Sequence, residues 1–215
     1  MRRVVILGAG GHAQVVADAL LRAHEGDSPL LPIGFLDDNP ALTGQRFLGL
    51  PVMGAIADLP AIDHDALIVA IGNNRTRQSL FEKLQRQGES FAIARHPSAV
   101  IAPDVQTGPG AMICAGVIVN PCTIIGANVI LNTGCTVDHH NRIGDHAHIA
   151  PGAHTGGEVT IGEGVFVGIG ATVIPGMSVG DWSVVGGGAC VIKPVPSGVT
   201  VVGVPARPIR TEEAE

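Results

Sequence analysis

Apolar residues recur at every sixth position along the second half of the chain. The repeat runs from residue 101 to residue 196 through sixteen consecutive hexads, and every lead residue is aliphatic except two, which are Thr. A helix would show a period of about 3.6 and a half-buried strand a period of 2. A period of six is typical of a parallel β-helix, in which each hexad forms one flat side of a triangular prism. The lead residues, predicted to point inward, are Ile101, Thr107, Ile113, Val119, Ile125, Leu131, Val137, Ile143, Ile149, Thr155, Ile161, Val167, Val173, Val179, Val185 and Val191.

Two further positions of the hexad are restricted. The fifth position is small or apolar almost throughout, including Cys135, so we expect it to point inward as well. The second position is Gly in half of the hexads, and we interpret these glycines as turn residues, because glycine adopts backbone conformations that β-branched residues avoid. The repeat therefore predicts a β-helix domain over residues 96–215, ending in a C-terminal tail.

The first half of the chain follows a different pattern, in which short apolar runs alternate with amphipathic segments. This alternation predicts a parallel sheet with helical crossovers over residues 1–95, the size of half a Rossmann-like domain. The expected strands are 3–7, 33–36, 67–71 and 91–94, with a loop over 37–66, and the expected helices are 14–23 and 74–87.

Three polar or glycine-rich loops follow the first three of these strands. Gly8–Ala13 satisfies the G-x-G-x-x-G/A pattern, Asp37-Asp38 ends the second strand, and Gly72–Asn74 follows the third, with Arg77 close behind. Each loop taken singly could be only a tight turn or a helix cap, with Asn73 or Asn74 as the cap. Together they lie where open parallel sheets bind ligands. Because the domain is too short for a second half, we expect a mononucleotide-sized ligand rather than NAD.

Histidines cluster where the hexad repeat turns polar. Five of the nine lie between residues 139 and 154, and the hexad that starts at Val137 carries Asn141 at its inward fifth position. A polar break in a regular fold indicates a functional site. His139 is a candidate general base, with Asp138 beside it to fix its tautomer, whereas His146 and His154 are expected only to fill corners or an interface. The gamma-class carbonic anhydrase arrangement, with two zinc-binding histidines five residues apart, does not occur here, so no metal is expected.

Composition excludes several classes of partner. The chain has 13 Lys+Arg against 19 Asp+Glu and no Tyr, which argues against nucleic acid as a partner. No run of 18 apolar residues predicts a membrane span, and the short apolar run after Met1 is interpreted as a strand rather than a signal peptide. The four cysteines form no CxxC pair, which indicates a reducing, cytoplasmic location.

An ordered set of motifs resembles the hexapeptide-repeat acyltransferases, in the branch that contains nucleotide-amino-sugar N-acetyltransferases and sialic-acid O-acetyltransferase-like proteins. The resemblance covers nearly the whole chain. The motifs are Gly8-Ala9-Gly10-Gly11-His12, Phe35-Leu36-Asp37-Asp38, Ile71-Gly72-Asn73-Asn74, His96-Pro97-Ser98-Ala99, Leu131-Asn132-Thr133, Asp138-His139, Gly186-Gly187-Gly188 and Gly203-Val204-Pro205-Ala206-Arg207.

The resemblance implies a left-handed β-helix and a homotrimer with active sites between subunits. It also implies acetyl-CoA as cosubstrate, a nucleotide-linked amino sugar such as GDP-perosamine as acceptor, and His139 as general base. The family often has an acidic residue directly after this base, where this chain has His140, so Asp138 and His140 are both candidates to support it. The nucleotide-sugar ligands implied by position are Gly10, Gly11, His12, Asp37, Asp38, Gly72, Asn73, Asn74 and Arg77, and the acetyl-CoA ligands are Asn132, His148, Ile169 and Gly187.

The sequence therefore predicts an N-acetyltransferase in which the C4 amine of the sugar attacks the thioester directly. A UDP-4-amino-sugar N-acetyltransferase remains as an alternative, because nothing in the loops distinguishes guanine from uracil. A sialic-acid-type O-acetyltransferase, which shares the architecture, is a second alternative. A non-enzymatic nucleotide-binding trimer ranks below them, and a gamma-type hydratase ranks last.

Overall fold

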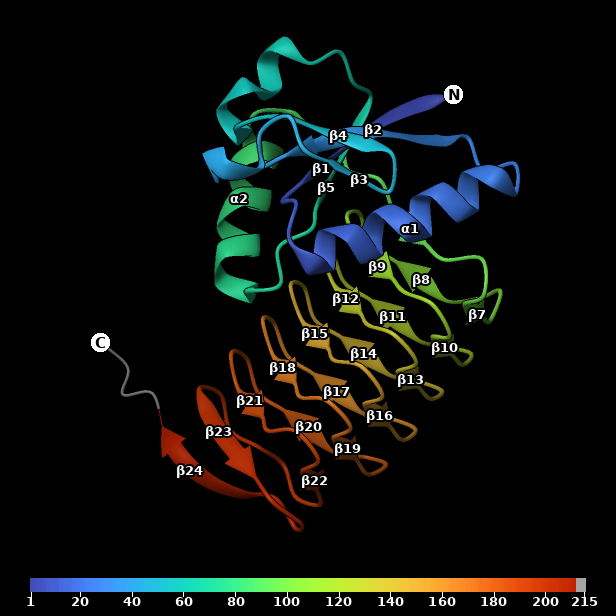
Figure 1. Cartoon of the computed structure of the whole chain (residues 1–215). Helices are drawn as coiled ribbons and strands as arrows, with labels where there is room; N and C mark the ends of the chain where they lie inside the picture. The colour runs from blue at the N-terminus through green and yellow to red at the C-terminus, as the bar shows by residue number, and fades with distance from the viewer. Residues whose placement is uncertain (212–215) are drawn as a thin grey trace. The chain divides into compact units, whose positions relative to one another are not determined.

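The computed structural model describes residues 1–211, and these residues form two compact units that meet in sequence at Pro97 and Ser98 (Figure 1). The last residues of the predicted C-terminal tail, 212–215, lie outside the described residues. No helix within residues 1–211 combines the length and the apolar character that a membrane crossing requires.

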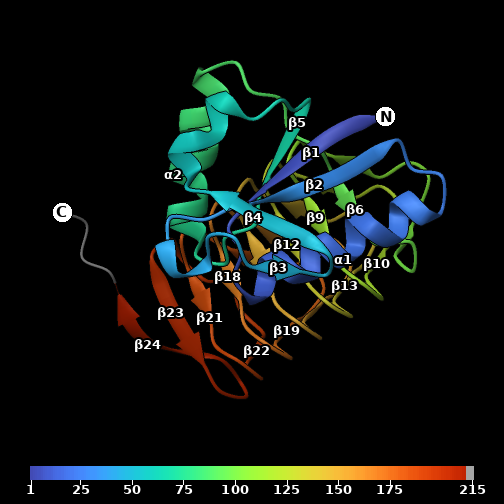
Figure 2. The ribbon, with the colours of Figure 1, turned by 45° about the horizontal axis from the view of Figure 1, so that its top comes forward.

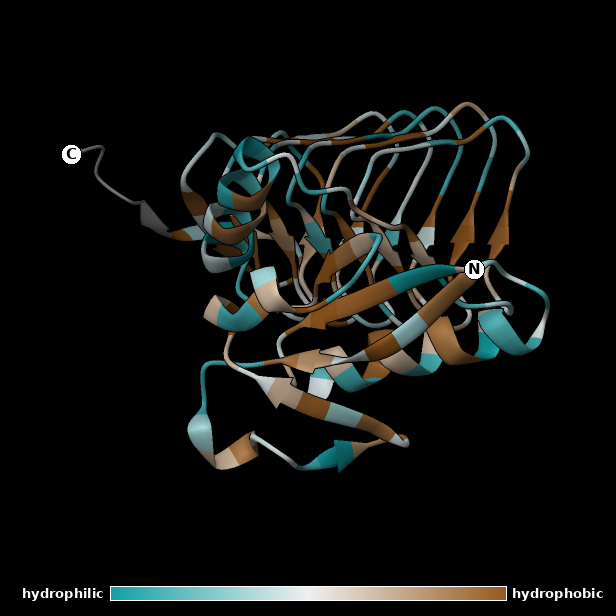
Figure 3. Ribbon diagram, turned by 90° about the horizontal axis from the view of Figure 1, so that it is seen from above, coloured by the Kyte–Doolittle hydropathy of each residue, from teal (hydrophilic) through white to brown (hydrophobic). Residues whose placement is uncertain are grey.

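Unit 1 is built on a sheet with the strand order β3-β4-β2-β1-β5 (Figure 2). The central strand β1 runs parallel to both β2 and β5, and residues 4–7 of β1 have no exposed surface. Figure 3 shows the inner part of the strand that starts at the N-terminus as hydrophobic. The strands of this sheet are β1 (Arg2–Leu7), β2 (Leu30–Leu36), β3 (Arg46–Phe47), β4 (Leu50–Gly54) and β5 (Ala66–Val69). The next strand of the chain, β6 (Ala94–Arg95), does not belong to it.

Two α-helices and two 3₁₀-helices complete unit 1. Helix α1 (Gly11–Glu25) follows β1 and buries an alanine-rich face, and helix α2 (Asn74–Arg86) follows β5 and buries Phe81 and Leu84. Asn73 is the N-cap of α2, because its side chain accepts a hydrogen bond from the Thr76 amide. The 3₁₀-helices are η1 (Pro40–Leu42) and η2 (Ile56–Ala61).

The predicted elements of unit 1 differ from the structure in two segments. The predicted loop over residues 37–66 contains η1, β3, β4 and η2, with β3 and β4 forming a short antiparallel hairpin. The strand predicted over 91–94 is wrong: Phe91 makes one isolated bridge to Leu67, and β6 begins only at Ala94. The α/β class itself is confirmed, with strands and helices alternating as predicted.

Unit 2 is a left-handed parallel β-helix, as predicted. From β7 to β22, paired strands lie eighteen residues apart, so three hexads make one coil. We name the three sides after their first strands. The β7 side contains β7 (Val100–Ile101), β10 (Ile118–Val119), β13 (Thr136–Val137), β16 (His154–Thr155), β19 (Thr172–Val173) and β22 (Cys190–Val191). The β8 side contains β8 (Gln106–Thr107), β11 (Ile124–Ile125), β14 (Arg142–Ile143), β17 (Thr160–Ile161) and β20 (Ser178–Val179). The β9 side contains β9 (Met112–Ile113), β12 (Ile130–Leu131), β15 (His148–Ile149), β18 (Phe166–Val167), β21 (Val184–Val185), β23 (Val199–Val202) and the antiparallel β24 (Arg207–Thr211).

The inward positions of the hexad form the core of the prism. Every lead residue from Ile113 to Val191 is buried, and Cys135 at a fifth position has no exposed surface. Ile101 and Thr107, in the first coil, are only half-buried. Because the interior is filled by these side chains, the prism is a solid rod, and its chemistry lies on its corners and outer faces.

The role assigned to the second-position glycines is wrong. The left-handed turn residue is the fourth position, which has positive φ in every hexad from Gly110 to Gly188, including His140 (φ 59°) and His146 (φ 60°). The second-position glycines have no positive φ. A Cβ added to Gly144 would lie 2.7 Å from the Glu163 backbone nitrogen in the next coil. Close stacking of neighbouring coils therefore explains these glycines.

Candidate active site

The glycine loop of unit 1 is fastened to the end of β2 by one carboxylate. Oδ2 of Asp37 accepts a hydrogen bond from the Ala9 amide at 2.7 Å, and Oδ1 accepts one from the Asn39 amide at 2.9 Å. Gly10 is the N-cap of α1 and supplies no side-chain cap, and a Cβ added to Gly10 or Gly11 would meet nothing within 4 Å. The space beside both glycines is therefore open, so that an anion can approach the start of α1.

Two titratable side chains, those of Arg77 and His12, lie near this loop. Arg77 is fully buried, and its Nη1 donates to the carbonyl oxygens of Ile71 and Gly72 at 3.0 and 3.4 Å. Burial lowers the pKa of Arg77 to about 9, which leaves it charged at neutral pH. Burial, and then the charge of Arg77, lower the pKa of His12 to about 4, so this imidazole is neutral at pH 7. The structure thus brings the Gly8–His12 loop, Asp37 and the Gly72 loop together around one buried positive charge.

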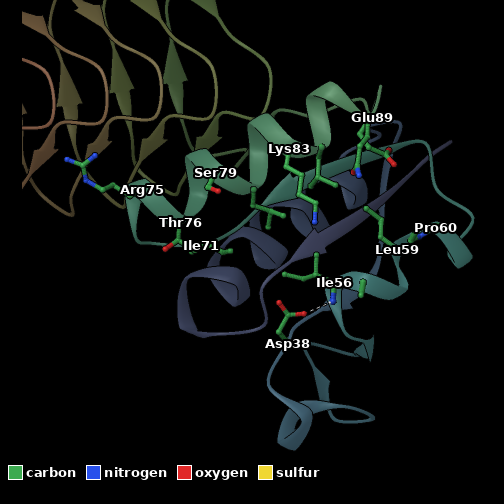
Figure 4. A pocket seen from close by; sticks show the side chains of 14 residues that line it. Asp38, Ile56, Leu59, Pro60, Ile71, Arg75, Thr76, Ser79, Lys83 and Glu89 are labelled. Atoms are coloured by element: carbon green, nitrogen blue, oxygen red, sulfur yellow. Dashed lines mark hydrogen bonds between the residues drawn. The ribbon is translucent and has the colours of Figure 1, made fainter. Parts of the chain in front are cut away.

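A cleft with a volume of about 880 Å³ opens between α2 and η2 in unit 1. Asp38 lies at one end, where its Oδ1 accepts a hydrogen bond from the Ile56 amide at 2.9 Å. Figure 4 shows Lys83 extending from α2 into the space between the walls, while Arg75 points away from it. Seven of the fourteen lining residues are apolar, and the other seven are polar or charged, two of them acidic and two basic. Apolar walls with a few polar groups are typical of small-molecule sites. The residues that line the cleft are Asp38, Ile56, Ala57, Leu59, Pro60, Ile71, Arg75, Thr76, Ser79, Leu80, Lys83, Leu84, Gln87 and Glu89.

In unit 2, His139 lies at the corner between β13 and β14, where the β7 and β8 sides meet. Its Nδ1 lies 3.0 Å from Nδ1 of His140, and the two rings meet edge to face. Asp138 does not hydrogen-bond the imidazole: its Oδ1 accepts from the His139 backbone amide at 2.8 Å and from the Asn120 side chain at 2.7 Å. These bonds lower the pKa of Asp138, the Asn120 bond most. His140, not Asp138, is therefore the side chain that meets the ring.

The next coil passes directly under the His139 ring. A Cβ added to Gly157 would lie 2.4 Å from Cε1 and 2.7 Å from Nε2 of His139, so only glycine leaves room for the imidazole here. The fully buried Asn141 lies beneath the same turn inside the prism. Gly157 was not predicted from the sequence, although it lies eighteen residues after His139 and the coil length would have identified it.

The four residues predicted for acetyl-CoA form two contact groups. Asn132 Nδ2 lies 3.1 Å from His148 Nε2, and the His148 ring packs edge to face on Phe166. Ile169 is 66% exposed, and a Cβ added to Gly187 would lie 3.4 Å from the Ile169 carbonyl oxygen in the previous coil. Asn132, Ile169 and Gly187 all occupy the corner between the β9 and β7 sides.

His139 and the acetyl-CoA candidates thus lie at different corners of one prism. The whole β7 side separates the two corners. An imidazole cannot reach across a side of six residues, so one copy of the chain does not bring its own His139 to its own Asn132 corner.

The other histidines of the cluster have ordinary structural contacts. His146 is buried, with its Nδ1 2.9 Å from the Asn128 side-chain nitrogen, and His154 Nδ1 lies 2.8 Å from the Thr136 hydroxyl. Within residues 1–211, no group of three or more His, Cys, Asp or Glu side chains has the arrangement of a metal site.

Comparison with known proteins gives a family match on the first unit and longer matches to individual relatives. The PglD N-terminal domain family matches residues 3–84. The chain is 33% identical over 183 residues to GDP-perosamine N-acetyltransferase of Escherichia coli O157:H7, covering 82% of this chain and 81% of that protein. It is 38% identical over 119 residues to UDP-N-acetylbacillosamine N-acetyltransferase of Bacillus subtilis strain 168, covering 54% of this chain and 52% of that one.

A solved structure matches over nearly its whole length. The crystal structure of PerB from Caulobacter crescentus, in complex with CoA and GDP-perosamine, superposes with a TM-score of 0.89 at 40% identity. The match covers 96% of this chain and 97% of that one.

Proposed function

The chain belongs to the family of nucleotide-amino-sugar N-acetyltransferases, and from this premise we propose that it acetylates the C4 amine of GDP-perosamine. The family makes it an acyltransferase that takes an acetyl group from acetyl-CoA and places it on the amine of a nucleotide-linked sugar. The observation that carries the choice of GDP-perosamine is the structure of PerB, which holds that sugar nucleotide and CoA and matches 96% of this chain.

His139 is the general base of the proposed reaction. The sugar amine attacks the thioester carbonyl carbon, and its proton passes to Nε2 of His139. The C–S bond then breaks, and the protonated imidazole gives the proton to the leaving sulfur, so that coenzyme A departs as the thiol and His139 is neutral again. A backbone amide of the β-helix stabilises the negative charge on the carbonyl oxygen. A covalent acyl-cysteine is not part of the scheme. Burial raises the pKa values of Cys114 and Cys135 to about 12. The exposed Cys122, one coil before His140, also has a raised pKa, chiefly through its hydrogen bond to Asp104.

His140 sets the tautomer of the base in this scheme. For Nε2 to accept a proton, the hydrogen of neutral His139 must be on Nδ1, which lies 3.0 Å from Nδ1 of His140. A neutral His140 that is protonated on Nε2 offers a lone pair at Nδ1 and accepts this hydrogen bond. Asp138 instead fixes the main chain through the His139 amide.

Unit 1 binds the nucleotide in this proposal. The amides of Gly10 and Gly11 at the start of α1 meet the phosphates, with the buried charge of Arg77 behind them. The base enters the cleft beside Asp38, whose carboxylate accepts from ring N–H groups, as both guanine and uracil require. His12, Gly72, Asn73 and Asn74 complete the loops around this site.

The active enzyme is proposed to be a homotrimer with sites between subunits. Support comes from the separate corners of the prism: His139 of one copy can meet the Asn132 corner only of a neighbour. The β7 side between the corners carries Val100 and Ile118, which are 64% and 41% exposed in the single chain and would be covered by neighbouring copies. Static light scattering would give the mass of three chains, and the mass of one chain would contradict the proposal. We also place the enzyme in the cytoplasm, where its four free cysteines stay reduced.

The first experiment is a thiol-release assay with acetyl-CoA and two acceptors, GDP-perosamine and a UDP-4-amino-4,6-dideoxy sugar. We expect turnover with GDP-perosamine and at most slow turnover with the UDP sugar. The reverse result would support the second candidate, a UDP-4-amino-sugar N-acetyltransferase, which the similarity to the Bacillus enzyme favours. No turnover with either amine, in a protein that still binds coenzyme A, would point to a hydroxyl acceptor such as sialic acid.

A further inference from the structure

We propose that Asn141 is a positioning residue that holds His139 in place from inside the prism. The inference rests on the proposed role of His139 as the base and adds a residue to it. Asn141 has no exposed surface, so it meets neither substrate and acts only through the main chain of the His139 turn.

The side-chain amide of Asn141 joins two coils. The two hydrogens of its Nδ2 serve three carbonyl oxygens, so that one hydrogen is shared. These oxygens belong to Asp138 at 2.7 Å, His139 at 3.2 Å and, in the next coil, Gly156 at 2.8 Å. The first two carbonyls stand on either side of the His139 Cα. Fixing both restricts rotation of the two peptide planes that flank this residue, and hence the direction of its Cα–Cβ bond.

Thr123, in the preceding coil, reinforces the same carbonyl. Its hydroxyl donates to the Asp138 oxygen at 2.9 Å and lies 3.4 Å from the Asn141 backbone amide, which donates to it. Thr123 is also fully buried. The main chain of the His139 turn is thereby held by buried polar groups from two coils.

Packing and turn geometry do not account for this amide. The corner that carries His146 has the same left-handed residue (φ 60°) and has the apolar Ala147 at its fifth position. A histidine in such a turn therefore forms without an inward amide. Asn141 Oδ1 accepts no hydrogen bond from the described residues, so the amide leaves a buried polar atom unsatisfied. Val159, at the same position of the next coil, shows that the interior accepts valine. The feature that distinguishes this corner from the others is the proposed base, so we connect Asn141 with His139.

The test is Asn141→Val, with Ser183→Ala as the matched control. Ser183 is fully buried at a fifth position as well, and it donates to the Pro196 carbonyl and accepts from the Val199 amide, far along the chain from His139. We expect Asn141→Val to fold with a Tm below that of wild type, because buried carbonyl oxygens lose their hydrogen bonds. It should lose 10- to 100-fold in kcat and keep both KM values within threefold. Ser183→Ala should lower Tm and leave kcat within twofold. Asn141→Ser keeps one donor and should fall between wild type and Asn141→Val.

Three results would overturn the proposal. They are a kcat of Asn141→Val within twofold of wild type, a raised KM at unchanged kcat, or an equal loss of kcat in Ser183→Ala. If Asn141→Val does not fold, Thr123→Val tests the same carbonyl with a smaller change and should lower kcat without raising KM. Failure of the proposed function itself would show as an inactive wild type. In that case hydrogen exchange at the amides of residues 138–141 would test whether Asn141 holds the turn. If it does, exchange at these amides is faster in Asn141→Val than in wild type and unchanged in Ser183→Ala.

Discussion

The imidazole of His139 contacts a second imidazole and a glycine, and these two neighbours lie at very different distances from it along the sequence. His140 is adjacent in sequence, yet its part at the ring depends on a left-handed backbone (φ 59°) that turns its side chain back towards residue 139. Gly157 is eighteen residues away and arrives by stacking of coils. The sequence predicted His139 as the base and named Asp138 and His140 as candidates to support it. The geometry of the corner was needed to show that His140 is the one that meets the ring. Gly157 could have been found from the coil length alone.

Replacing the base should slow the enzyme without unfolding it. We expect His139→Asn to lower kcat by about 10²–10⁴-fold, the usual contribution of general-base catalysis, because an amide cannot take the proton from the amine. His140→Asn should lose much less, since Asn can still accept a hydrogen bond from Nδ1 of His139. Steady-state kinetics with circular dichroism as a check on folding would measure both. A His139→Asn protein within threefold of wild type would rule out this base.

Gly157→Ala tests the position of the ring. The new methyl group would lie 2.4 Å from Cε1 of His139, so the imidazole must move by about 1 Å. A displacement of this size can cost about 10²-fold in rate when reacting groups are held for attack. We expect kcat to fall on that order while the affinity for coenzyme A, measured by calorimetry, is unchanged. Gly26→Ala, where the new Cβ makes only ordinary contacts, is the control and should retain full activity.

At the scale of the secondary-structure elements, the hexad repeat predicted which residues are inside but not why particular positions are glycine. The second and fourth positions are both rich in Gly in the sequence, yet the reasons differ. At the fourth position the backbone is left-handed, while at the second the next coil lies too close for a side chain. The sequence shows a preference for Gly at both positions. It does not show whether the cause is the backbone conformation or a close contact with a neighbouring coil.

Two alanine substitutions would separate these reasons. Gly144→Ala places a methyl group against the backbone of residues 162 and 163, so the coils must separate, and we expect a loss of about 3 kcal/mol in the free energy of unfolding. Gly134→Ala meets nothing within 4 Å and only strains a positive φ of 66°, for a loss of about 1 kcal/mol. Denaturant unfolding of both variants gives the comparison. Equal losses would contradict the close-stacking explanation.

The segment 37–66 shows where element prediction failed in unit 1. Its strand β3 has two residues, and η2 contains Pro60, so neither produces a period long enough to detect. The cleft between η2 and α2 was therefore not predicted apart from Asp38, because its η2 wall belongs to this segment.

At the scale of the whole molecule, the stability of unit 1 in acid depends on two histidines whose pKa values are shifted in opposite directions. Burial, and then Arg77, lower the pKa of His12 to about 4. His64 has a raised pKa: burial lowers it, but hydrogen bonds to the Ile62 carbonyl and the Glu89 carboxylate outweigh that effect. The first shift weakens unit 1 in acid, and the second strengthens it.

Removing His12 should reduce the acid sensitivity of unit 1. Below pH 6.5 the unfolded chain binds a proton that folded His12 refuses, so the free energy of unfolding falls as pH decreases from 6.5 towards 4. Between pH 6.5 and 5 this amounts to about 2 kcal/mol, which His12→Gln should not lose. Guanidinium unfolding followed at 222 nm reports on unit 1, since α1 and α2 both lie there. Parallel pH curves for the two proteins would contradict the assignment.

Because one coil of the prism takes eighteen residues, the number of residues between two positions determines whether their side chains lie on the same side of the prism. Because β7, β10 and β13 pair without any shift in register, a deletion of eighteen residues between His139 and Ile169 would shorten the rod by one turn and leave every later side chain facing its own way. A deletion of six would also keep the interior apolar, and the protein would fold. It would nevertheless carry Ile169 and Gly187 one third of a turn away from the corner they share with Asn132. Insertions and deletions in this stretch are therefore compatible with catalysis only in whole turns.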